Sequence, residues 1–402
     1  MTFRSKQIVD WWFGSLLLLA LYLPVRGLGL LLRRDHSFAT RRGCAVIKLV
    51  GAGSLFLAMP SMQAIRGQFP ERRFFLVGTR AVANFAEPFG WFDEAWIIDD
   101  DTLARLILTS LRALWQVATT CDHLIDLEVH SRLTTVFSVL TTVRNRIGFV
   151  DEIVFWRRAY YTHMTFFNPQ GPVYSFYDML ATWFGVERVD VRAFHAAFRA
   201  SVLRETQPAG ATLPADYVVL APGCSDLSRE RRLLAEEWKD LLHRLGVRAD
   251  RVVVLGASGD RELCAAVAGQ LGAAADLAGQ LSILQSARVL AGASRLLGID
   301  SLLLHLARAL DVPSVSIWGP SDPATLLRSG RAQDIVYFAE MACSPCIHVY
   351  ATPPCRGARP CIPAALRRAP VHLADPSATA PAIGWAIGPN DTQVREVRVG
   401  HD

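Results

Sequence analysis

Residues 297–320, LGIDSLLLHLARALDVPSVSIWGP, decide the fold. An apolar run ends at Asp300, and apolar residues then recur at spacings of three and four, which predicts a helix. The apolar side of this helix carries Leu303, Leu304, Ala307 and Leu310. The sequence DVP at 311–313 ends the helix, and the β-branched run 314–318 predicts a strand. The turn at Asp300 either caps the helix with its carboxylate or offers backbone N–H groups to a phosphate, and this stretch leaves both interpretations open.

The same pattern recurs along the C-terminal half of the chain. Apolar runs at 217–221, 251–255, 289–290 and 314–318 each end in a turn of small residues, and helical stretches separate them. A similar alternation of strands and helices runs from residue 45 to residue 127. Such alternation predicts parallel sheets that bind ligands at the carboxyl ends of their strands. We therefore predict an α/β chain with two doubly wound, Rossmann-like domains facing a central cleft.

Composition suggests four segments. Residues 1–42 form an apolar, membrane-associating segment, 43–205 the N-terminal domain, 214–375 the C-terminal domain and 376–402 a flexible tail. A Pro/Gly/Ala/Thr stretch at 206–214 is the predicted linker. The formal charge of +5 is modest and no long basic run is present, so nucleic acid is not expected as a partner.

The N-terminal segment contains the apolar run 11–25, WWFGSLLLLALYLPV, between Lys6 and Arg26. Its uncharged length falls short of the roughly 20 residues that a spanning helix needs. Paired Trp side chains and flanking cations are typical of helices in the membrane interface, which is the favoured interpretation. A buried core helix is the second, and a span extended to residue 32, which would bury Arg26, is the third.

Several motifs follow one another along the chain. They are KLVGAGS at 48–54, RIGF at 146–149, APGCS at 221–225, RRLLAEEW at 231–238, LAGQLS at 277–282 and the opening stretch. Each is weak alone, but their order and spacing resemble glycosyltransferase family 9, the ADP-heptose:lipopolysaccharide heptosyltransferase family. The resemblance implies the two-domain GT-B fold and an inverting sugar transfer that needs no metal cofactor. It also implies a nucleotide-sugar donor, ADP-heptose above all, and a lipopolysaccharide-core-like or lipid-linked glycan acceptor. The apolar N-terminal segment would hold the protein at the cytoplasmic face of the inner membrane, peripherally or through a short anchor.

The resemblance also implies a donor site in the C-terminal domain. Its predicted residues are Asp300, Ser301, His305, Arg231, Arg232, Ser225 and Gly256. A cation beside the donor diphosphate favours its departure as negative charge develops, and we prefer Arg232 for this role. The alternatives are a solvated charge run for RERR (229–232), a packing histidine for His305 and a plain tight turn at Gly256.

The catalytic base is less evident, because Ser54 stands where family members carry an Asp. A serine has little basicity near neutral pH without a base of its own. Asp126 and Glu128, which follow a predicted strand of the N-terminal domain, are the replacement candidates, with Glu128 preferred and His163 weaker. The alternative for Glu128 is a surface carboxylate that pairs with Arg132, four residues later.

The remaining motif is a group of cysteines, Cys343, Cys346, Cys355 and Cys361. Their spacing suggests a structural zinc or iron site, with two disulfides or free thiols as alternatives. For the whole chain, two further functions stay open: a catalytically silent family member that acts as a scaffold, and a protein O-heptosyltransferase.

Overall fold

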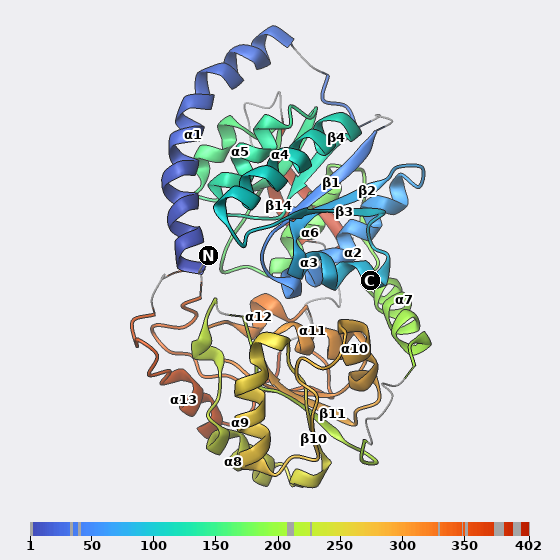
Figure 1. Ribbon diagram of the computed structural model, residues 1–402, viewed down its shortest axis with the longest axis vertical. Helices are drawn as coiled ribbons and strands as arrows, with labels where there is room; N and C mark the ends of the chain where they lie inside the picture. Colours follow the sequence, from blue (N-terminus) through green and yellow to red (C-terminus); the bar gives the residue numbers. More distant parts are fainter. Residues whose placement is uncertain are drawn as a thin grey trace. The chain divides into compact units, whose positions relative to one another are not determined.

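The computed structural model describes residues 3–32, 35–38, 42–206, 213–225, 227–328, 330–347, 349, 353–373, 382–388 and 395–401 (Figure 1). The chain forms two compact units. Unit 1 comprises residues 1–190 and 379–402, and unit 2 comprises residues 191–378. Each unit is a largely parallel sheet covered by helices, which confirms the predicted fold class of two Rossmann-like sheets preceded by an apolar helix.

Unit 1 is built on a nine-stranded sheet in the order β3-β2-β1-β4-β5-β6-β14-β15-β7. The strands are β1 (Gly43–Lys48), β2 (Phe74–Thr79), β3 (Glu94–Ile98), β4 (Cys121–Asp126), β5 (Asn145–Val150), β6 (His163–Phe166), β7 (Arg188–Val189), β14 (Ala382–Ile387) and β15 (Arg395–His401). The first six in this order are parallel, and β14 continues the sheet antiparallel to β6. The chain order reverses between β1 and β4, so the carboxyl ends of these two strands form the switch point at which such sheets bind ligands.

Helices cover both faces of the unit 1 sheet. They are α1 (Phe3–Leu32), α2 (Ala52–Gln68), α3 (Arg80–Ala86), α4 (Leu103–Thr120), α5 (Arg132–Leu140) and α6 (Val173–Thr182), with short 3-10 turns η1 (Glu87–Phe89) and η2 (Phe155–Ala159). Helix α1 is long and apolar enough, over Gln7–Gly29, to be a candidate membrane span by length and composition alone. It nevertheless packs along α5 (Figure 1).

Unit 2 has a six-stranded, fully parallel sheet in the order β10-β9-β8-β11-β12-β13. The strands are β8 (Val218–Ala221), β9 (Val252–Val254), β10 (Ala275–Asp276), β11 (Arg295–Ile299), β12 (Ser314–Ile317) and β13 (Ile335–Tyr337). The helices are α7 (Val191–Arg204), α8 (Ala235–Arg244), α9 (Arg261–Leu271), α10 (Ile283–Ala291), α11 (Leu302–Ala309), α12 (Pro323–Leu326) and α13 (Cys361–Arg367), with 3-10 turns η3 (Arg229–Arg231), η4 (Ala249–Arg251) and η5 (Ser258–Asp260). Here the switch point lies between β8 and β11.

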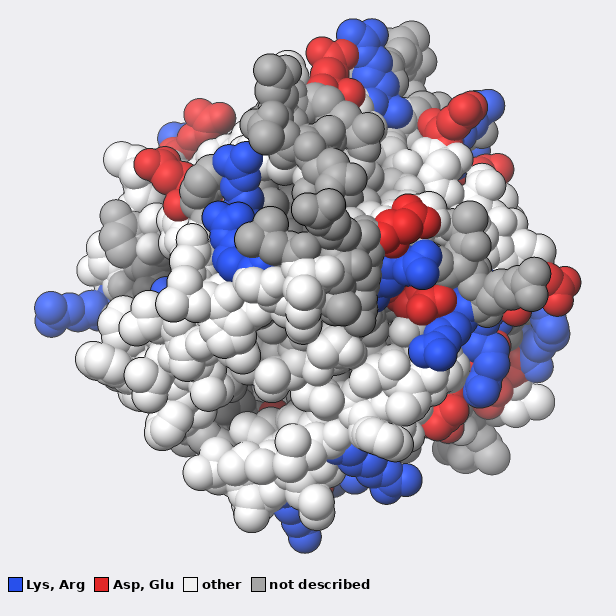
Figure 2. Space-filling model, turned by 90° about the horizontal axis from the view of Figure 1, so that it is seen from above, with Lys and Arg blue, Asp and Glu red and all other residues white. Residues whose placement is uncertain are grey.

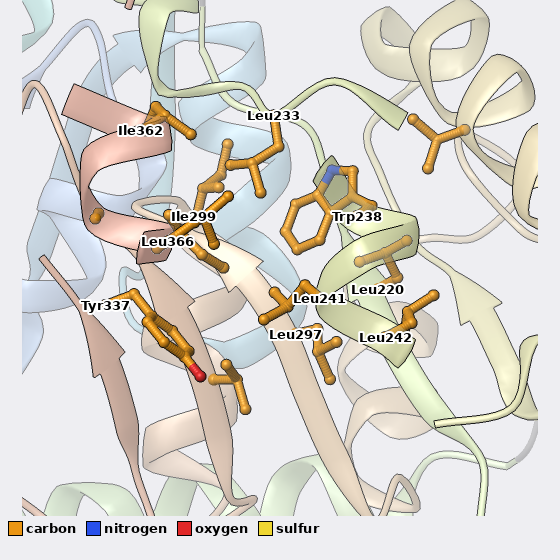
Figure 3. Packing of buried hydrophobic residues seen from close by; sticks show 14 of the residues in the cluster. Leu220, Leu233, Trp238, Leu241, Leu242, Leu297, Ile299, Tyr337, Ile362 and Leu366 are labelled. Carbon is orange, nitrogen blue, oxygen red and sulfur yellow. The ribbon is translucent and has the colours of Figure 1, made fainter. Parts of the chain in front are cut away.

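An apolar core holds α8, α9 and α13 of unit 2 against its strands. Trp238 of α8, which is fully buried, points toward the sheet beside Leu220 and Leu297, and Ile362 of α13 completes the cluster from the other side (Figure 3). Burying a large side chain contributes roughly 1.5–3 kcal/mol, so this core fixes the positions of the strand ends. Residues of the candidate site come soon after these strand ends in the chain.

Two predicted boundaries differ from the structure. Helix α7, assigned to the N-terminal domain, belongs to unit 2, where it contacts α10 and α11. The tail 376–402, expected to be flexible, contributes β14 and β15 to the unit 1 sheet because β6 offers a free edge to pair with. The linker predicted at 206–214 lies largely outside the described residues.

Candidate active site

A buried ion pair occupies the switch point of the unit 2 sheet. Asp300 follows β11, and its Oδ2 lies 3.2 Å from Nη1 of Arg231, which also donates to the Asp300 backbone oxygen at 2.7 Å. Ser225, which follows β8, accepts from Arg231 Nη2 at 2.9 Å, and Ser321 donates to Asp300 Oδ2 at 2.8 Å. The structure thus brings together Asp300, Arg231 and Ser225, and Arg231 is buried rather than part of a solvated charge run.

The helix after Asp300 begins beside this pair. Ser301 is the N-cap of α11, but its side chain makes no capping bond, and its buried hydroxyl has no hydrogen-bond partner in the described part of the chain. His305 lies one turn later, with Nε2 4.0 Å from Asp300 Oδ1. Burial lowers the pKa of His305 to about 4, although Asp300 opposes the shift. The turn therefore presents a helix N-terminus and a free hydroxyl, both of which suit an anionic group.

Arg232 points to a different carboxylate. Its Nη2 donates to the Cys224 backbone oxygen at 3.1 Å and lies 3.3 Å from Asp260 Oδ1. The Arg232 side chain is 23 % exposed, against 8 % for Arg231, so Arg232 is the more accessible cation. Gly256, at the end of β9, has a packing role: a Cβ there would lie 2.7 Å from Cys264 Sγ.

The cysteine-rich segment packs against the turn that follows β12. The backbone N–H of Cys346 donates to Pro320 O at 2.9 Å, and all four cysteines are free thiols. Burial raises the pKa of Cys346, and the nearby Cys355 and Cys343 add to the rise. Even so, no group of three or more His, Cys, Asp or Glu residues in the described ranges is placed to hold a metal ion. Cys346 and Cys355 also act on Cys361, so the four thiols lie near one another and the zinc or iron site stays a prediction.

Glu128 lies at the switch point of the unit 1 sheet, just beyond β4. Its Oε1 accepts from the backbone N–H groups of Leu49 and Val50 at 2.8 and 3.0 Å and lies 3.2 Å from Lys48 Nζ. Its other oxygen, Oε2, accepts no hydrogen bond from any described residue. Arg132 is engaged elsewhere, over the rings of Trp11 and Trp156. Glu128 is therefore a fixed carboxylate with one oxygen available, not the partner of Arg132.

Asp126 lies directly beneath Glu128 and is fully buried. Its Oδ2 is 2.6 Å from Arg157 Nη2 and accepts the Tyr161 hydroxyl, while Oδ1 accepts the Glu128 backbone N–H at 2.9 Å. Burial raises the pKa of Asp126, and Arg157 counteracts the rise. Enclosed in this way, Asp126 positions Glu128 and cannot meet an acceptor hydroxyl, contrary to its prediction as an alternative base.

Of the other candidates, Ser54 follows the carboxyl end of β1 at the switch point, whereas His163 lies elsewhere. Ser54 is in the first turn of α2, and its hydroxyl donates to the Gly51 backbone oxygen at 2.8 Å. His163 begins β6, so it lies at the amino ends of the strands, where it is buried against Phe38 and Trp183. The switch point lies at the opposite, carboxyl ends of the parallel strands, so His163 is not part of the site.

The family model described as glycosyltransferase family 9 (heptosyltransferase) matches residues 122–353 of the chain. The chain belongs to this family. "Lipopolysaccharide heptosyltransferase 1" of Pseudomonas aeruginosa is 37 % identical over 110 residues, which cover 27 % of this chain and 31 % of that protein. The chain thus matches about a third of the length of this curated relative.

Solved structures share the fold of this family 9 chain. The Escherichia coli ADP-heptose lipopolysaccharide heptosyltransferase II superposes with a TM-score of 0.55 at 16 % identity, over 75 % of this chain and 91 % of that one. The E. coli heptosyltransferase WaaC with ADP-2-deoxy-2-fluoro heptose superposes with a TM-score of 0.56 at 18 % identity, over 74 % and 93 %. At these identities the likeness concerns the fold.

Three supporting residues of this family 9 chain were not among the site residues predicted from the sequence. Arg157 donates to the backbone oxygens of Glu128 and Val129 at 2.8 and 2.7 Å, so it holds the loop after β4 from below. In unit 2, the Ser321 hydroxyl donates to the Asp300 carboxylate, and Arg359 donates to the Arg232 backbone oxygen at 3.1 Å. The small-residue turn GPS at 319–321 was a signal for Ser321, whereas nothing local marks Arg157 or Arg359.

Proposed function

We propose that this chain transfers heptose from ADP-heptose to a hydroxyl of a lipopolysaccharide-core-like or lipid-linked glycan, with inversion at the anomeric carbon. The observation that carries the proposal is the site between β8 and β11, where Arg231, Asp300 and Ser225 surround the N-terminus of α11. The relatives named lipopolysaccharide heptosyltransferase, and the neighbour solved with an ADP-heptose analogue, supply the donor and acceptor classes.

On this proposal, unit 2 holds the donor. The backbone N–H groups that begin α11 and the unpartnered Ser301 hydroxyl receive the diphosphate. Arg232, the more accessible arginine, faces the charge that develops as ADP departs. Arg231 is neutralised by Asp300 and keeps the turn in shape, with Asp300 and His305 next to the sugar.

Unit 1 supplies the base. The acceptor oxygen forms a bond to the anomeric carbon while the bond from that carbon to the ADP oxygen breaks, and ADP leaves with the electron pair. The acceptor proton moves to Oε2 of Glu128, the oxygen that the loop donors leave available. A positioned general base contributes typically 10²–10⁴-fold to the rate.

The apolar helix α1 would keep the enzyme at the cytoplasmic face of the inner membrane, where a lipid-linked acceptor lies. Attachment is peripheral or through this short N-terminal anchor. Because α1 exposes most of its apolar side chains, it suits an interface better than a protein core.

The test uses the purified full-length chain with ADP-heptose and a heptose-deficient lipopolysaccharide extract. Binding is measured by calorimetry, ADP release by a coupled assay, and the configuration of the product by NMR of the anomeric proton. Turnover with inversion is expected. Binding without turnover on any glycan would identify a silent scaffold, labelling of protein fractions alone would identify a protein O-heptosyltransferase, and absence of ADP-heptose binding would overturn the proposal.

Glu128→Gln tests the base. The substitution should lower kcat by about 10²–10⁴-fold and leave the Kd for ADP-heptose within twofold, since the amide oxygen still accepts the loop N–H groups. The control is Glu71→Gln, which changes an exposed carboxylate remote from Glu128 in the sequence. A kcat for Glu128→Gln within threefold of wild type would place the base elsewhere.

A further inference from the structure

Helix α4 is apolar on two sides. Its inner side chains, Ala113 and Val117, are buried in the core under the unit 1 sheet. Its outer side exposes large apolar groups, of which Leu108 is 69 % and Trp115 is 70 % exposed. The complete outer set is Leu103, Ile107, Leu108, Leu111 and Trp115. The spacing of this set by four, one, three and four residues places it on one continuous face.

Helix α1 adds a second apolar face on the same side of the sheet. One side of α1 is committed to unit 1: the Asp10 carboxylate accepts from the N–H groups of Arg132 and Leu133 at 3.0 and 2.9 Å, at the start of α5. Further along, Gly14 packs directly on Arg132, and Leu18 joins the core beneath. Because these contacts run along the helix, α1 lies on the folded unit, which a helix crossing a bilayer alone could not do.

The other side of α1 exposes Trp12, Leu16, Leu19 and Leu23, and Leu19 is 76 % exposed. Helix α5 contacts both α1 and α4, so the three helices form one row over the sheet (Figure 1). Seen from the end of the molecule at which α1 finishes, a broad part of the surface carries neither basic nor acidic side chains (Figure 2).

We propose that the outer faces of α1 and α4 together form one lipid-binding surface, hereafter the α1/α4 surface, which inserts into a bilayer interface without spanning it. This inference is independent of the proposed sugar transfer. It adds α4, a helix within the Rossmann-like sheet unit, to the membrane contact, and it sets the orientation of unit 1 with the row of α1, α5 and α4 toward the lipid.

The composition of the α1/α4 surface favours lipid as its occupant. Trp12 and Trp115 are amphipathic rings of the kind that gather at the headgroup level. Arg112 is exposed at the border of the apolar face of α4, where its stem can follow the apolar surface while its guanidinium reaches an anionic headgroup. Continuity with α1, the candidate membrane segment, extends one lipid contact instead of requiring two partners.

The test is flotation of the full-length chain with vesicles of phosphatidylethanolamine and phosphatidylglycerol at 3:1. Leu108→Glu combined with Leu111→Glu should lower vesicle partitioning at least tenfold, because each charge would enter the interface on the face of α4. Leu203→Glu, on the exposed side of α7 in unit 2, is the matched control and should change it less than twofold. Sedimentation velocity without vesicles is recorded for every variant.

Unchanged partitioning of the Leu108/Leu111 variant would overturn the proposal, and so would a shift from dimer to monomer with vesicle binding intact, which would identify a self-association surface. A second measurement covers a variant that misfolds. Brominated phosphatidylcholine in the vesicles should quench the wild-type fluorescence more strongly than that of Trp115→Phe, since the difference reports the depth of Trp115. Equal quenching of the two proteins would refute the insertion of α4.

Discussion

Arg231 and Asp300 form a buried ion pair in which Nη1 is shared between the carboxylate, at 3.2 Å, and the backbone oxygen of the same aspartate, at 2.7 Å. Because Arg231 follows β8 and Asp300 follows β11, the pair ties together the two central strand ends of unit 2. Removing both charges from water is costly, and hydrogen bonds from Ser321 and to Ser225 offset part of that cost.

Loss of the aspartate charge should destabilise unit 2. Asp300→Asn leaves the buried guanidinium of Arg231 without its counter-charge, and breaking such a pair costs about 3–5 kcal/mol of unfolding free energy. Urea unfolding measures the change. Asp311→Asn, at an exposed carboxylate, should stay within about 0.5 kcal/mol of wild type. An equal effect of the two substitutions would show that the pair contributes nothing.

The Ser301 hydroxyl should contribute to the affinity for ADP-heptose but not to the free energy of unfolding. Because the hydroxyl is buried without a partner among the described residues, Ser301→Ala should leave the free energy of unfolding unchanged or slightly higher. The same substitution should weaken ADP-heptose binding by about tenfold, the equivalent of one lost hydrogen bond to a charged group. Urea unfolding and calorimetry give the two values. A destabilised variant with unchanged affinity would assign Ser301 to the fold alone.

Arg157 should not be replaceable by lysine. Its planar guanidinium reaches Asp126, the Tyr161 hydroxyl and two loop carbonyl groups at once, which the point charge of Arg157→Lys cannot do. We expect a loss of about 2–4 kcal/mol in unfolding free energy, together with a lower kcat through displacement of Glu128. Arg158→Lys, at the exposed neighbour, is the control for both measurements. Wild-type values for Arg157→Lys would contradict the positioning role.

His305 makes stability depend on pH with a defined sign. Burial lowers the pKa of His305 to about 4 from an ordinary value near 6.5, so between these values the unfolded chain binds a proton that the folded chain does not. Stability therefore falls as the pH falls through this window, by up to about 1.4 kcal/mol per pH unit, and the contribution is constant above it.

The measurement is urea unfolding at pH 7, 6 and 5 for wild type and His305→Gln. The variant should lose less stability between pH 6 and 5 than wild type does. A residual slope of the same sign is expected, because burial also lowers the pKa of His123 to about 3 and of His195 to about 4. Identical slopes in the two proteins would contradict the assignment to His305.

The docking of α1 depends on the absence of a side chain at one position. An alanine Cβ at Gly14 would overlap Arg132 Cβ, so Gly14→Ala should separate α1 from α5 and raise amide hydrogen exchange across α1. Gly27→Ala is the matched control within the same helix, since nothing lies within 4 Å of a Cβ there. We expect the control to leave exchange unchanged or to slow it, because alanine favours helix by about 0.5–1 kcal/mol. Equal exchange in both variants would refute the close contact.

Much of the donor side could be predicted from sequence. The spacing of apolar residues located β11 and α11, and strand polarity then placed Asp300, Ser301 and Ser225 at one sheet edge. The base side could be predicted less well. Asp126 and Glu128 are two residues apart, and only the burial of the first and the open oxygen of the second separate their roles.

Hydrophobic periodicity and turn residues are local properties of the chain, so the sequence alone was enough to predict two doubly wound sheets and an apolar N-terminal helix. The tertiary structure decided that Arg231 rather than Arg232 pairs with Asp300, that β14 joins β6, and that α1 lies along α5. These are contacts between segments remote in sequence, chosen by side-chain reach, burial and the free edge of a sheet, none of which is written in the spacing of residues along the chain.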